Sequence, residues 1–155
     1  SPCKHIVVNG FDSPQTQETV EAAFYIGKYL ASDKITLVGE VSESRVTVSV
    51  NDDRSLRKVT LRKEKIDREE KMRFIDIIKK IPDTITEGLK YETQSIFGRR
   101  GYSIGHYARV VRADLLVMNA KEEQRFFHRF FPSDLDHMLT EIPTDLLIIR
   151  SKTYG

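Results

Sequence analysis

The chain is predicted to be an α/β protein built on a parallel sheet, because short apolar runs alternate with amphipathic segments along its length. The first 41 residues already contain one strand–helix–strand unit. Residues 5–9 form an apolar run that ends at Gly10, and residues 35–41 form a second run. Between them, Ser13 and Pro14 are typical of a helix start, and apolar residues follow at helical spacing. Such a unit crosses over in the right-handed sense and places its two strands parallel.

The middle of the chain departs from this alternation. Residues 45–50 read RVTVSV, an alternation of polar and apolar residues that is typical of a half-exposed strand. Residues 51–53 favour a turn, and the apolar residues of 59–61 supply a return strand. We therefore expect an extra β-hairpin at about 45–61, followed by a second helix with apolar residues from 72 to 81.

The second half of the chain returns to regular alternation of strands and helices. Its apolar runs have the length and composition of buried strands, and its amphipathic segments have helical periodicity. In chain order we expect a strand over 89–97, a helix containing 104–111, a strand over 113–118, a helix over about 133–141 and a strand over 146–149.

Composition sets the broad class of the protein. The 155 residues fit one domain, 1–155, with 39% hydrophobic and 31% charged residues, the balance of an ordinary globular protein. A formal net charge of +2 gives no overall attraction for nucleic acid. The single cysteine, Cys3, suits a reducing compartment, and no apolar run is long enough for a membrane span. The chain begins with Ser1-Pro2, which suggests either a tag remnant or a piece of a longer protein.

Residue patterns that carry chemistry are scarce in this sequence. The four histidines are far apart and none has metal-ligand spacing, so we expect no metal site. There is neither a nucleophile elbow nor a Walker sequence, and Ser133 has no evident base partner. We therefore expect no catalytic residues and no enzymatic activity.

Four short blocks occur in an order and spacing that are similar to those of a known family. They are residues 4–8 leading through Ser13 to Ala22-Ala23; Gly98, Ile104 and Ala108 leading to 113–118; Pro132-Ser133; and Pro143 ahead of 146–149. In these blocks the chain resembles the universal stress protein family over nearly its full length. The resemblance implies a three-layer sandwich whose five-stranded parallel sheet has the order 3-2-1-4-5, with helices on both faces.

Members of this family that bind ATP carry a glycine signature after the fourth strand: Gly, two residues, Gly, nine residues, Gly, then Ser or Thr. Laid on this chain, the signature falls on Asn119, Glu122, Pro132 and Ser133, so the spacing is kept and every glycine is replaced. Glu122 places a carboxylate where the family binds phosphate, so the two negative charges repel each other, and Pro132 removes one N–H donor. Asn119 tolerates left-handed backbone angles and therefore keeps the turn feasible.

The other half of the family's nucleotide site follows the first strand. Family members commonly have Asp-Gly-Ser there, with the Asp near adenine or ribose, whereas this chain has Phe11-Asp12-Ser13. Asp12 is thus displaced by one position. Together the residues Asp12, Ser13, Asn119, Glu122, Pro132 and Ser133 are interpreted as a degenerate nucleotide site. We expect no cofactor, with ATP or another adenine nucleotide as the alternative.

Two segments are predicted to form interfaces. The segment 123–131 holds Phe126, Phe127 and Phe130 among arginines, where ATP-binding relatives have a glycine-rich loop. These rings either fill the vacated cleft, or face a partner or second copy, or contact a membrane surface. The resemblance also implies homodimerisation through the last strand, whose candidate interface residues are Leu146, Leu147, Ile148 and Ile149.

The favoured function is a non-catalytic regulatory or assembly domain that works in the cytoplasm without ATP. Related domains occur as cytosolic parts of cation/proton antiporters. The resemblance therefore also implies a context in which this domain lies at the cytosolic face of a membrane protein, in the same chain as a transporter domain. The alternative is an adenine-nucleotide-binding universal stress protein. A weak hydrolase or phosphotransferase is the least favoured reading, and nucleic acid is not an expected partner.

Overall fold

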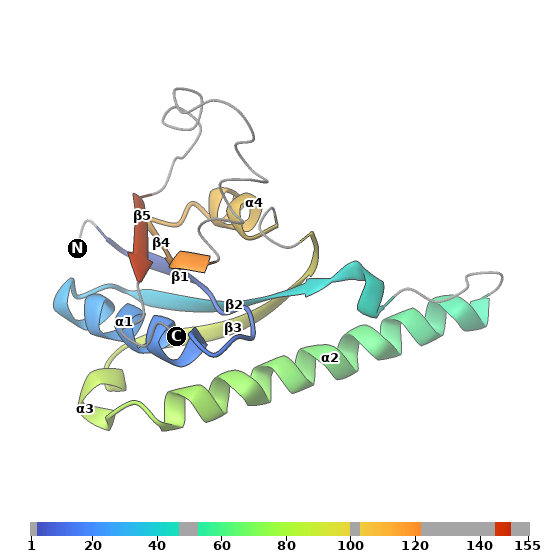
Figure 1. Cartoon of the computed structure of the whole chain (residues 1–155), viewed down its shortest axis with the longest axis horizontal. Coiled ribbons are helices and arrows are strands. Elements are labelled where there is room, and N and C mark those ends of the chain that lie inside the picture. The colour runs from blue at the N-terminus through green and yellow to red at the C-terminus, as the bar shows by residue number, and fades with distance from the viewer. Residues whose placement is uncertain (1–2, 47–52, 100–102, 122–144, 150–155) are drawn as a thin grey trace.

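A computed structural model of the chain describes residues 3–46, 53–99, 103–121 and 145–149. All strand pairings in it are parallel, and helices lie on both sides of the sheet. The predicted α/β class with a parallel sheet is confirmed. The strands are β1 (His5–Asn9), β2 (Lys34–Ser42), β3 (Lys90–Gly98), β4 (Leu115–Asn119) and β5 (Asp145–Ile149), in the spatial order β3-β2-β1-β4-β5 (Figure 1).

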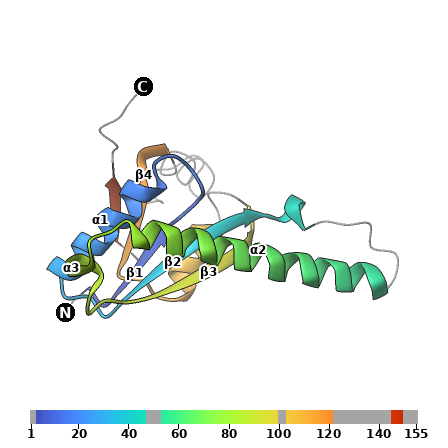
Figure 2. The ribbon, with the colours of Figure 1, turned by 90° about the horizontal axis from the view of Figure 1, so that it is seen from below.

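The helices divide between the two faces of this sheet. Figure 1 shows α1 and α2 below the strands and α4 above them, and Figure 2 shows α1 and α2 from their own side. The short helix α3 follows α2 and contacts α1. Their bounds are Thr16–Tyr29 for α1, Asp53–Lys79 for α2, Asp83–Thr86 for α3 and Ser103–Val110 for α4, and a single 3-10 turn, η1, covers Glu43–Arg45.

Two hydrophobic cores result, because successive side chains of a strand point to opposite faces. In β1, Ile6 and Val8 pack towards α1 and α2, together with Phe24 and Phe74. Val7 points the other way and packs with Ile104 and neighbouring residues of α4 and β4. Both sheet faces are therefore covered at β1, which is why this strand reads as a continuous apolar run.

The predicted hairpin at about 45–61 is wrong. Residues 59–61 lie inside α2, a helix of 27 residues, and Glu43–Arg45 form the 3-10 turn η1. The rest of its proposed first strand, 47–50, lies outside the described residues. The β-branched residues Val59 and Thr60 suggested a strand, but apolar residues at helical spacing from 59 to 74 put them on a long helix.

The start of the first helix also differs from the prediction. Ser13 and Pro14 form a turn ahead of the helix, and α1 begins two residues later at Thr16. The carbonyl of Ser13 accepts a hydrogen bond from the backbone N–H of Thr16, with an N···O distance of 3.2 Å. A tight turn therefore precedes the helix, and the predicted helix at about 133–141 lies outside the described residues.

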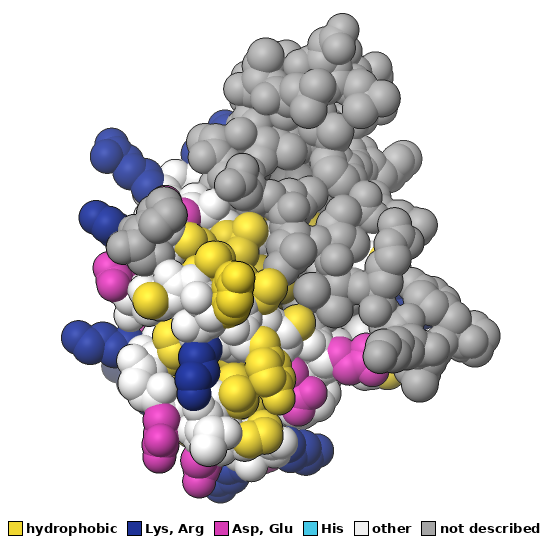
Figure 3. All heavy atoms as spheres, turned by 90° about the vertical axis from the view of Figure 1, so that its left-hand side faces the viewer, with side chains coloured by type: hydrophobic (Ala, Val, Ile, Leu, Met, Phe, Trp, Pro, Cys, Tyr) yellow, Lys and Arg dark blue, Asp and Glu magenta, His cyan; other side chains and the backbone are white. Residues whose placement is uncertain are grey.

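The end of the molecule at which α1 finishes has an apolar surface. Two tyrosines one helical turn apart, Tyr25 and Tyr29, are 50% and 88% exposed. Figure 3 views this end and shows a band of hydrophobic side chains bordered by charged ones.

Within the described ranges, every helix is too short or too polar to cross a bilayer.

Candidate functional site

The strand order reverses between β1 and β4, which are neighbours in the sheet although β2 and β3 separate them in sequence. In open parallel sheets, ligands bind at the carboxyl edge beside such a reversal. Here β1 ends at Asn9 and β4 ends at Asn119, and both residues are buried. The candidate site is therefore built from the turn after β1, the end of β4 and whatever packs against them.

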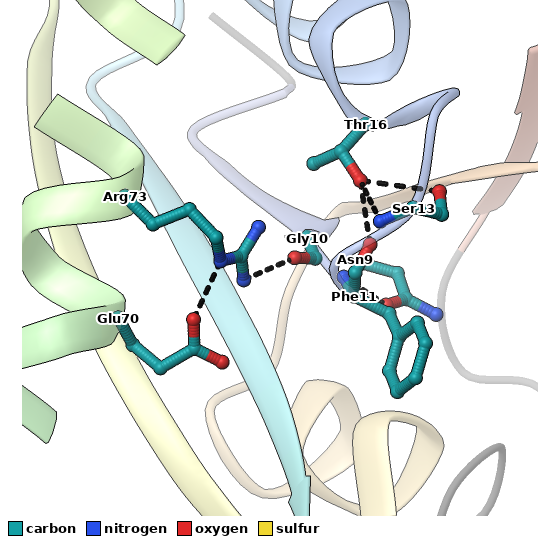
Figure 4. Close-up of polar contacts among 7 residues, drawn as sticks. All are labelled: Asn9, Gly10, Phe11, Ser13, Thr16, Glu70 and Arg73. Carbon is teal, nitrogen blue, oxygen red and sulfur yellow. Dashed lines mark hydrogen bonds and ion pairs between the residues drawn. The ribbon is translucent and has the colours of Figure 1, made fainter. Parts of the chain in front are cut away.

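The turn after β1 satisfies its own backbone donors. The N–H of Gly10 donates to the carbonyl of Val38 at 2.8 Å, and the N–H of Phe11 donates to Oδ1 of Asn9 at 3.1 Å. The N–H of Ser13 donates to Oγ1 of Thr16 at 3.0 Å, as Figure 4 shows. Three N–H groups of this turn are thus already paired within the protein and are not free to bind a ligand.

Thr16 is the residue that closes this turn. Its hydroxyl donates to the carbonyl of Phe11 at 2.6 Å and lies 3.2 Å from the hydroxyl of Ser13. The Ser13 hydroxyl in turn accepts from the N–H of Gln15 at 3.3 Å. Thr16 is 2% exposed and its partners Phe11 and Ser13 are half-buried, so its bonds are partly shielded from water and hold the turn shut.

The side chain of Asn9 leaves a donor open at the candidate site. Asn9 is 1% exposed, and its Nδ2 group has no hydrogen-bond partner in the described part of the chain. In Figure 4 this amide nitrogen points away from Gly10 and Arg73. Buried amide donors are nearly always paired, so this one marks a place where an acceptor would be stabilised.

Helix α2 contributes a second group of side chains at the end of β1. Arg73 donates from Nη2 to the carbonyl of Gly10 at 2.7 Å and from Nε to Oε2 of Glu70 at 2.6 Å (Figure 4). Its guanidinium also lies over the ring of Phe74, 4.4 Å from the centroid. The Nη1 group is buried without a partner among the described residues. Arg73 therefore ties α2 to the turn after β1.

Two glycines allow α2 to lie this close to the sheet. A Cβ atom on Gly10 would come within 2.4 Å of the Phe74 ring. A Cβ atom on Gly39 would come within 2.9 Å of Oε1 of Glu70. Both glycines follow apolar runs of β1 and β2, so their small size sets the distance between the sheet and α2.

The carboxyl ends of β2 and β3 organise the start of α4. Glu40 of β2 is 3% exposed, and its Oε2 accepts from the N–H of Ile104 at 2.8 Å. A carboxylate here satisfies an unpaired donor and complements the positive end of the helix. The hydroxyl of Ser103 accepts from the N–H of Arg99 at 2.9 Å, close to Gly98. These contacts position α4 but leave no nucleophile beside a base.

A second polar cluster lies at the opposite, amino end of the sheet. Nε2 of His5 is 2.8 Å from the hydroxyl of Thr36, which donates to Oε1 of Glu92 at 3.1 Å. Lys34 pairs with the same Glu92 oxygen at 3.2 Å. Burial and the charge of Lys34 lower the pKa of His5. The hydrogen bond from Lys34 lowers the pKa of Glu92, and burial raises the pKa of Tyr107 nearby.

The structure describes only part of the site predicted from the sequence. Ser13 lies in the closed turn, Asp12 beside it is exposed, and Asn119 ends β4 at the same sheet edge. Leu146, Leu147, Ile148 and Ile149 belong to β5, which pairs with β4 alone among the described strands. Outside the described residues lie Glu122, Phe126, Phe127, Phe130, Pro132 and Ser133.

Sequence reasoning missed three residues of this region. Arg73 and Glu70 reach it from a helix more than 55 residues further along the chain, and no local pattern indicates such a contact. Asn9 was detectable, because a polar residue that ends a buried strand at the sheet edge is a candidate ligand group. In the described ranges no three His, Cys, Asp or Glu side chains gather as metal ligands would.

Comparison with known proteins gives a consistent picture of the fold. No family model and no curated protein sequence matches the chain. Solved structures of universal stress proteins do match it. The UspA protein from Lactobacillus plantarum is 17% identical, with a TM-score of 0.61 over 97% of this chain and 99% of that one.

Two of the matching structures contain adenine nucleotides. A universal stress protein in complex with cAMP is 17% identical, with a TM-score of 0.55 over 97% of this chain and 98% of that one. The protein from Archaeoglobus fulgidus in complex with dAMP is 12% identical, with a TM-score of 0.54 over 94% and 96%. At these identities the shared property is the fold, because one fold hosts many functions.

Proposed function

We propose that this chain is a non-catalytic regulatory or assembly domain of the universal stress protein type that works without ATP. The observation that carries this proposal is the closed turn after β1. A nucleotide lying over the end of β1 would need free backbone N–H groups in this turn, and those of Gly10, Phe11 and Ser13 are all paired within the protein. Opening the turn for a ligand would break the hydrogen bonds of Thr16, which is itself buried.

The sequence beyond the described residues supports the same function. Glu122 and Pro132 occupy signature positions at which ATP-binding relatives have glycine. The first adds a negative charge that repels phosphate, and the second removes an N–H donor. Both halves of the site thus disfavour nucleotide, each for its own physical reason.

The proposal includes how such a domain would act. It would dimerise through β5, the strand at one edge of the described sheet, because an unpaired edge is a template for strand addition. It would serve as the cytosolic regulatory part of a membrane ion transporter. Apolar spans upstream of this segment in the full-length gene would support that context, and a gene encoding this domain alone would contradict it.

A second candidate function is that of an adenine-nucleotide-binding universal stress protein. The buried, unpaired Nδ2 group of Asn9 favours it, because this donor lies at the strand-order reversal and requires an acceptor. Structures of the same fold with cAMP and dAMP point to the class of ligand. In this function Asn9 and Asn119 would contact the nucleotide, with Asp12 and Ser13 alongside.

Thermal unfolding with and without nucleotide separates the two functions. A ligand at a hundredfold over its dissociation constant adds about 2.7 kcal/mol, which is a rise of about 5–10 °C for a domain of this size. We expect no shift with ATP and magnesium, AMP or cyclic di-AMP. A shift with one of them that disappears in Asn9→Ala would establish the second function instead.

A matched variant shows whether the lost glycines are the reason why the chain does not bind ATP. Glu122→Gly combined with Pro132→Gly restores two signature positions but leaves the turn after β1 closed, so we expect an ATP-dependent shift only when Thr16→Ala is added. A shift in the double variant without Thr16→Ala would mean that the lost glycines, and not the closed turn, prevent binding.

A further inference from the structure

The outer side of α2 carries a stripe of basic and apolar residues, with the carboxylates of Glu69 and Asp76 beside its second half. Arg57, Leu61, Lys65, Arg68 and Met72 follow one another at intervals of three or four residues, so they form one stripe along the helix. All five are exposed, and the two apolar ones, Leu61 and Met72, are 57% and 55% exposed. Lys58 and Arg62 border the stripe and are exposed too. We name these seven residues the basic face.

Contacts on the opposite side of α2 fix which way this face points. Ile66 is 5% exposed and packs with Val41 and Val46, and Phe74 is fully buried against the sheet. The basic face therefore turns away from the domain. Figures 1 and 2 show that the first half of α2 also projects beyond the strands. Of the described side chains from 56 to 65, all but that of Val59 are exposed, so this part of the helix is accessible to an outside partner.

Charge is divided unevenly along the helix. Residues 53–66 contain six basic and two acidic side chains, whereas residues 67–79 contain four of each. The first half thus carries a charge of +4 in a chain whose net charge is only +2. A concentrated positive surface of this kind attracts an anionic partner over several ångströms before contact.

We propose that the basic face docks on an anionic lipid membrane. The cations would lie against the lipid headgroups, and Leu61 and Met72 would enter the boundary between headgroups and acyl chains. An amphipathic basic helix with apolar residues among its cations is the arrangement that such a surface binds. This inference does not depend on whether the sheet edge binds a nucleotide.

Three features favour a membrane over other partners. Leu61 and Met72 are more than half exposed within the basic face, and a nucleic acid backbone would leave both without an apolar partner. The seven residues of the face include no aromatic ring on which a base could stack. A second copy of the same face would bring equal charges together and be repelled.

Vesicle co-sedimentation tests the proposal with the whole chain. We expect binding to vesicles of phosphatidylcholine with 30% phosphatidylserine, loss of binding on vesicles of phosphatidylcholine alone, and weakening as salt rises. Arg62→Gln with Lys65→Gln should lower the affinity at least about tenfold. Lys79→Gln with Lys80→Gln removes the same charge from exposed lysines outside the basic face and should leave binding within about twofold.

A second pair of variants tests the apolar contribution. Leu61 and Leu56 are each 57% exposed on the same helix, but only Leu61 belongs to the basic face. Leu61→Ser should weaken vesicle binding severalfold, whereas Leu56→Ser should leave it unchanged. Both changes are on the surface, and unfolding curves of the variants should match that of the parent chain.

Two outcomes would overturn the proposal. One is the absence of binding to phosphatidylserine vesicles at low salt. The other is tight binding to a labelled DNA or RNA duplex, measured by anisotropy, that depends on Arg62 and Lys65 while Leu61→Ser has no effect on either partner. That second result would assign the basic face to nucleic acid.

Discussion

The two halves of α2 belong to one helix but have different surroundings. From Ile66 onwards, the helix packs on the sheet, and Phe74 and Arg73 reach the end of β1. Before Ile66, described side chains such as Leu56 and Leu61 are exposed, and positive charge accumulates. Helical periodicity is the same in both halves, so it explains why the segment is a helix but not why one half is buried and the other exposed. The difference comes from what lies opposite: a sheet face for one half and solvent for the other.

Truncating the packed half should give the largest effect. Phe74→Ala removes a fully buried ring between α2 and the sheet, and we expect a loss of about 3–5 kcal/mol in the free energy of unfolding. Leu56→Ala, in the exposed half, should stay within about 0.5 kcal/mol. Denaturant titration measures both. Equal losses in the two variants would show that the halves are packed alike.

The glycine beneath Phe74 should respond next most strongly. Gly10→Ala places a Cβ 2.4 Å from the ring and 3.1 Å from the carbonyl of Val38, so we expect a loss of about 1–3 kcal/mol. Gly39→Ala meets the flexible carboxylate of Glu70 instead and should cost less. Combining Gly10→Ala with Phe74→Leu should recover part of the loss. If the double variant were additive, the clash would not be the cause.

Removing the arginine should have a smaller effect than either apolar change. Arg73→Met keeps much of the side-chain volume but leaves the carbonyl of Gly10 and the carboxylate of Glu70 without this donor. We expect a loss of about 1–2 kcal/mol in unfolding free energy. Arg73→Lys should lose less unfolding free energy than Arg73→Met but remain less stable than the parent chain, because a lysine cannot donate in two directions from a planar fork. A fully stable Arg73→Met would mean that the arginine is not needed to hold the turn.

The smallest effect concerns pH and lies at the other end of the sheet. The folded pKa of His5 is below its unfolded value of about 6.5, so the unfolded chain takes up a proton first as pH falls. The stability linked to His5 is therefore complete above that pH and decreases below it. His5→Gln should flatten the stability profile between pH 7 and 5.5 in denaturant titrations. His106→Gln, on the exposed side of α4, is the control, and an unchanged profile in His5→Gln would contradict the assignment.

Local sequence was sufficient where an element is buried on both faces. β1, β2 and β4 read as apolar runs because neighbours cover them on each side, and that requirement is visible in the residues themselves. It failed at residues 59–61, where a short β-prone stretch outweighed the longer helical spacing around it. Strand propensity depends on the surroundings of a residue, and residues 59–61 belong to a long helix whose first half projects beyond the sheet.

The candidate site was only partly predictable for a similar reason. Ser13 and Asn119 follow strands, so the alternation of strands and helices brings them to one edge. Which groups are already paired is a different matter, because it depends on contacts such as that of Thr16 with Phe11. Arg73 reaches the site only through the length and angle of α2, which no short pattern encodes.

The continuity of α2 has a mechanical consequence. The helix is about 40 Å long at 1.5 Å per residue and is assigned as one α-helix over its 27 residues. It therefore behaves as a lever, with Ile66, Phe74 and the two glycines as its bearing on the sheet. A load on the projecting end is transmitted to that bearing and to the bond between Arg73 and Gly10. Whatever pulls on the far end of the lever thus strains the same turn that closes the sheet edge.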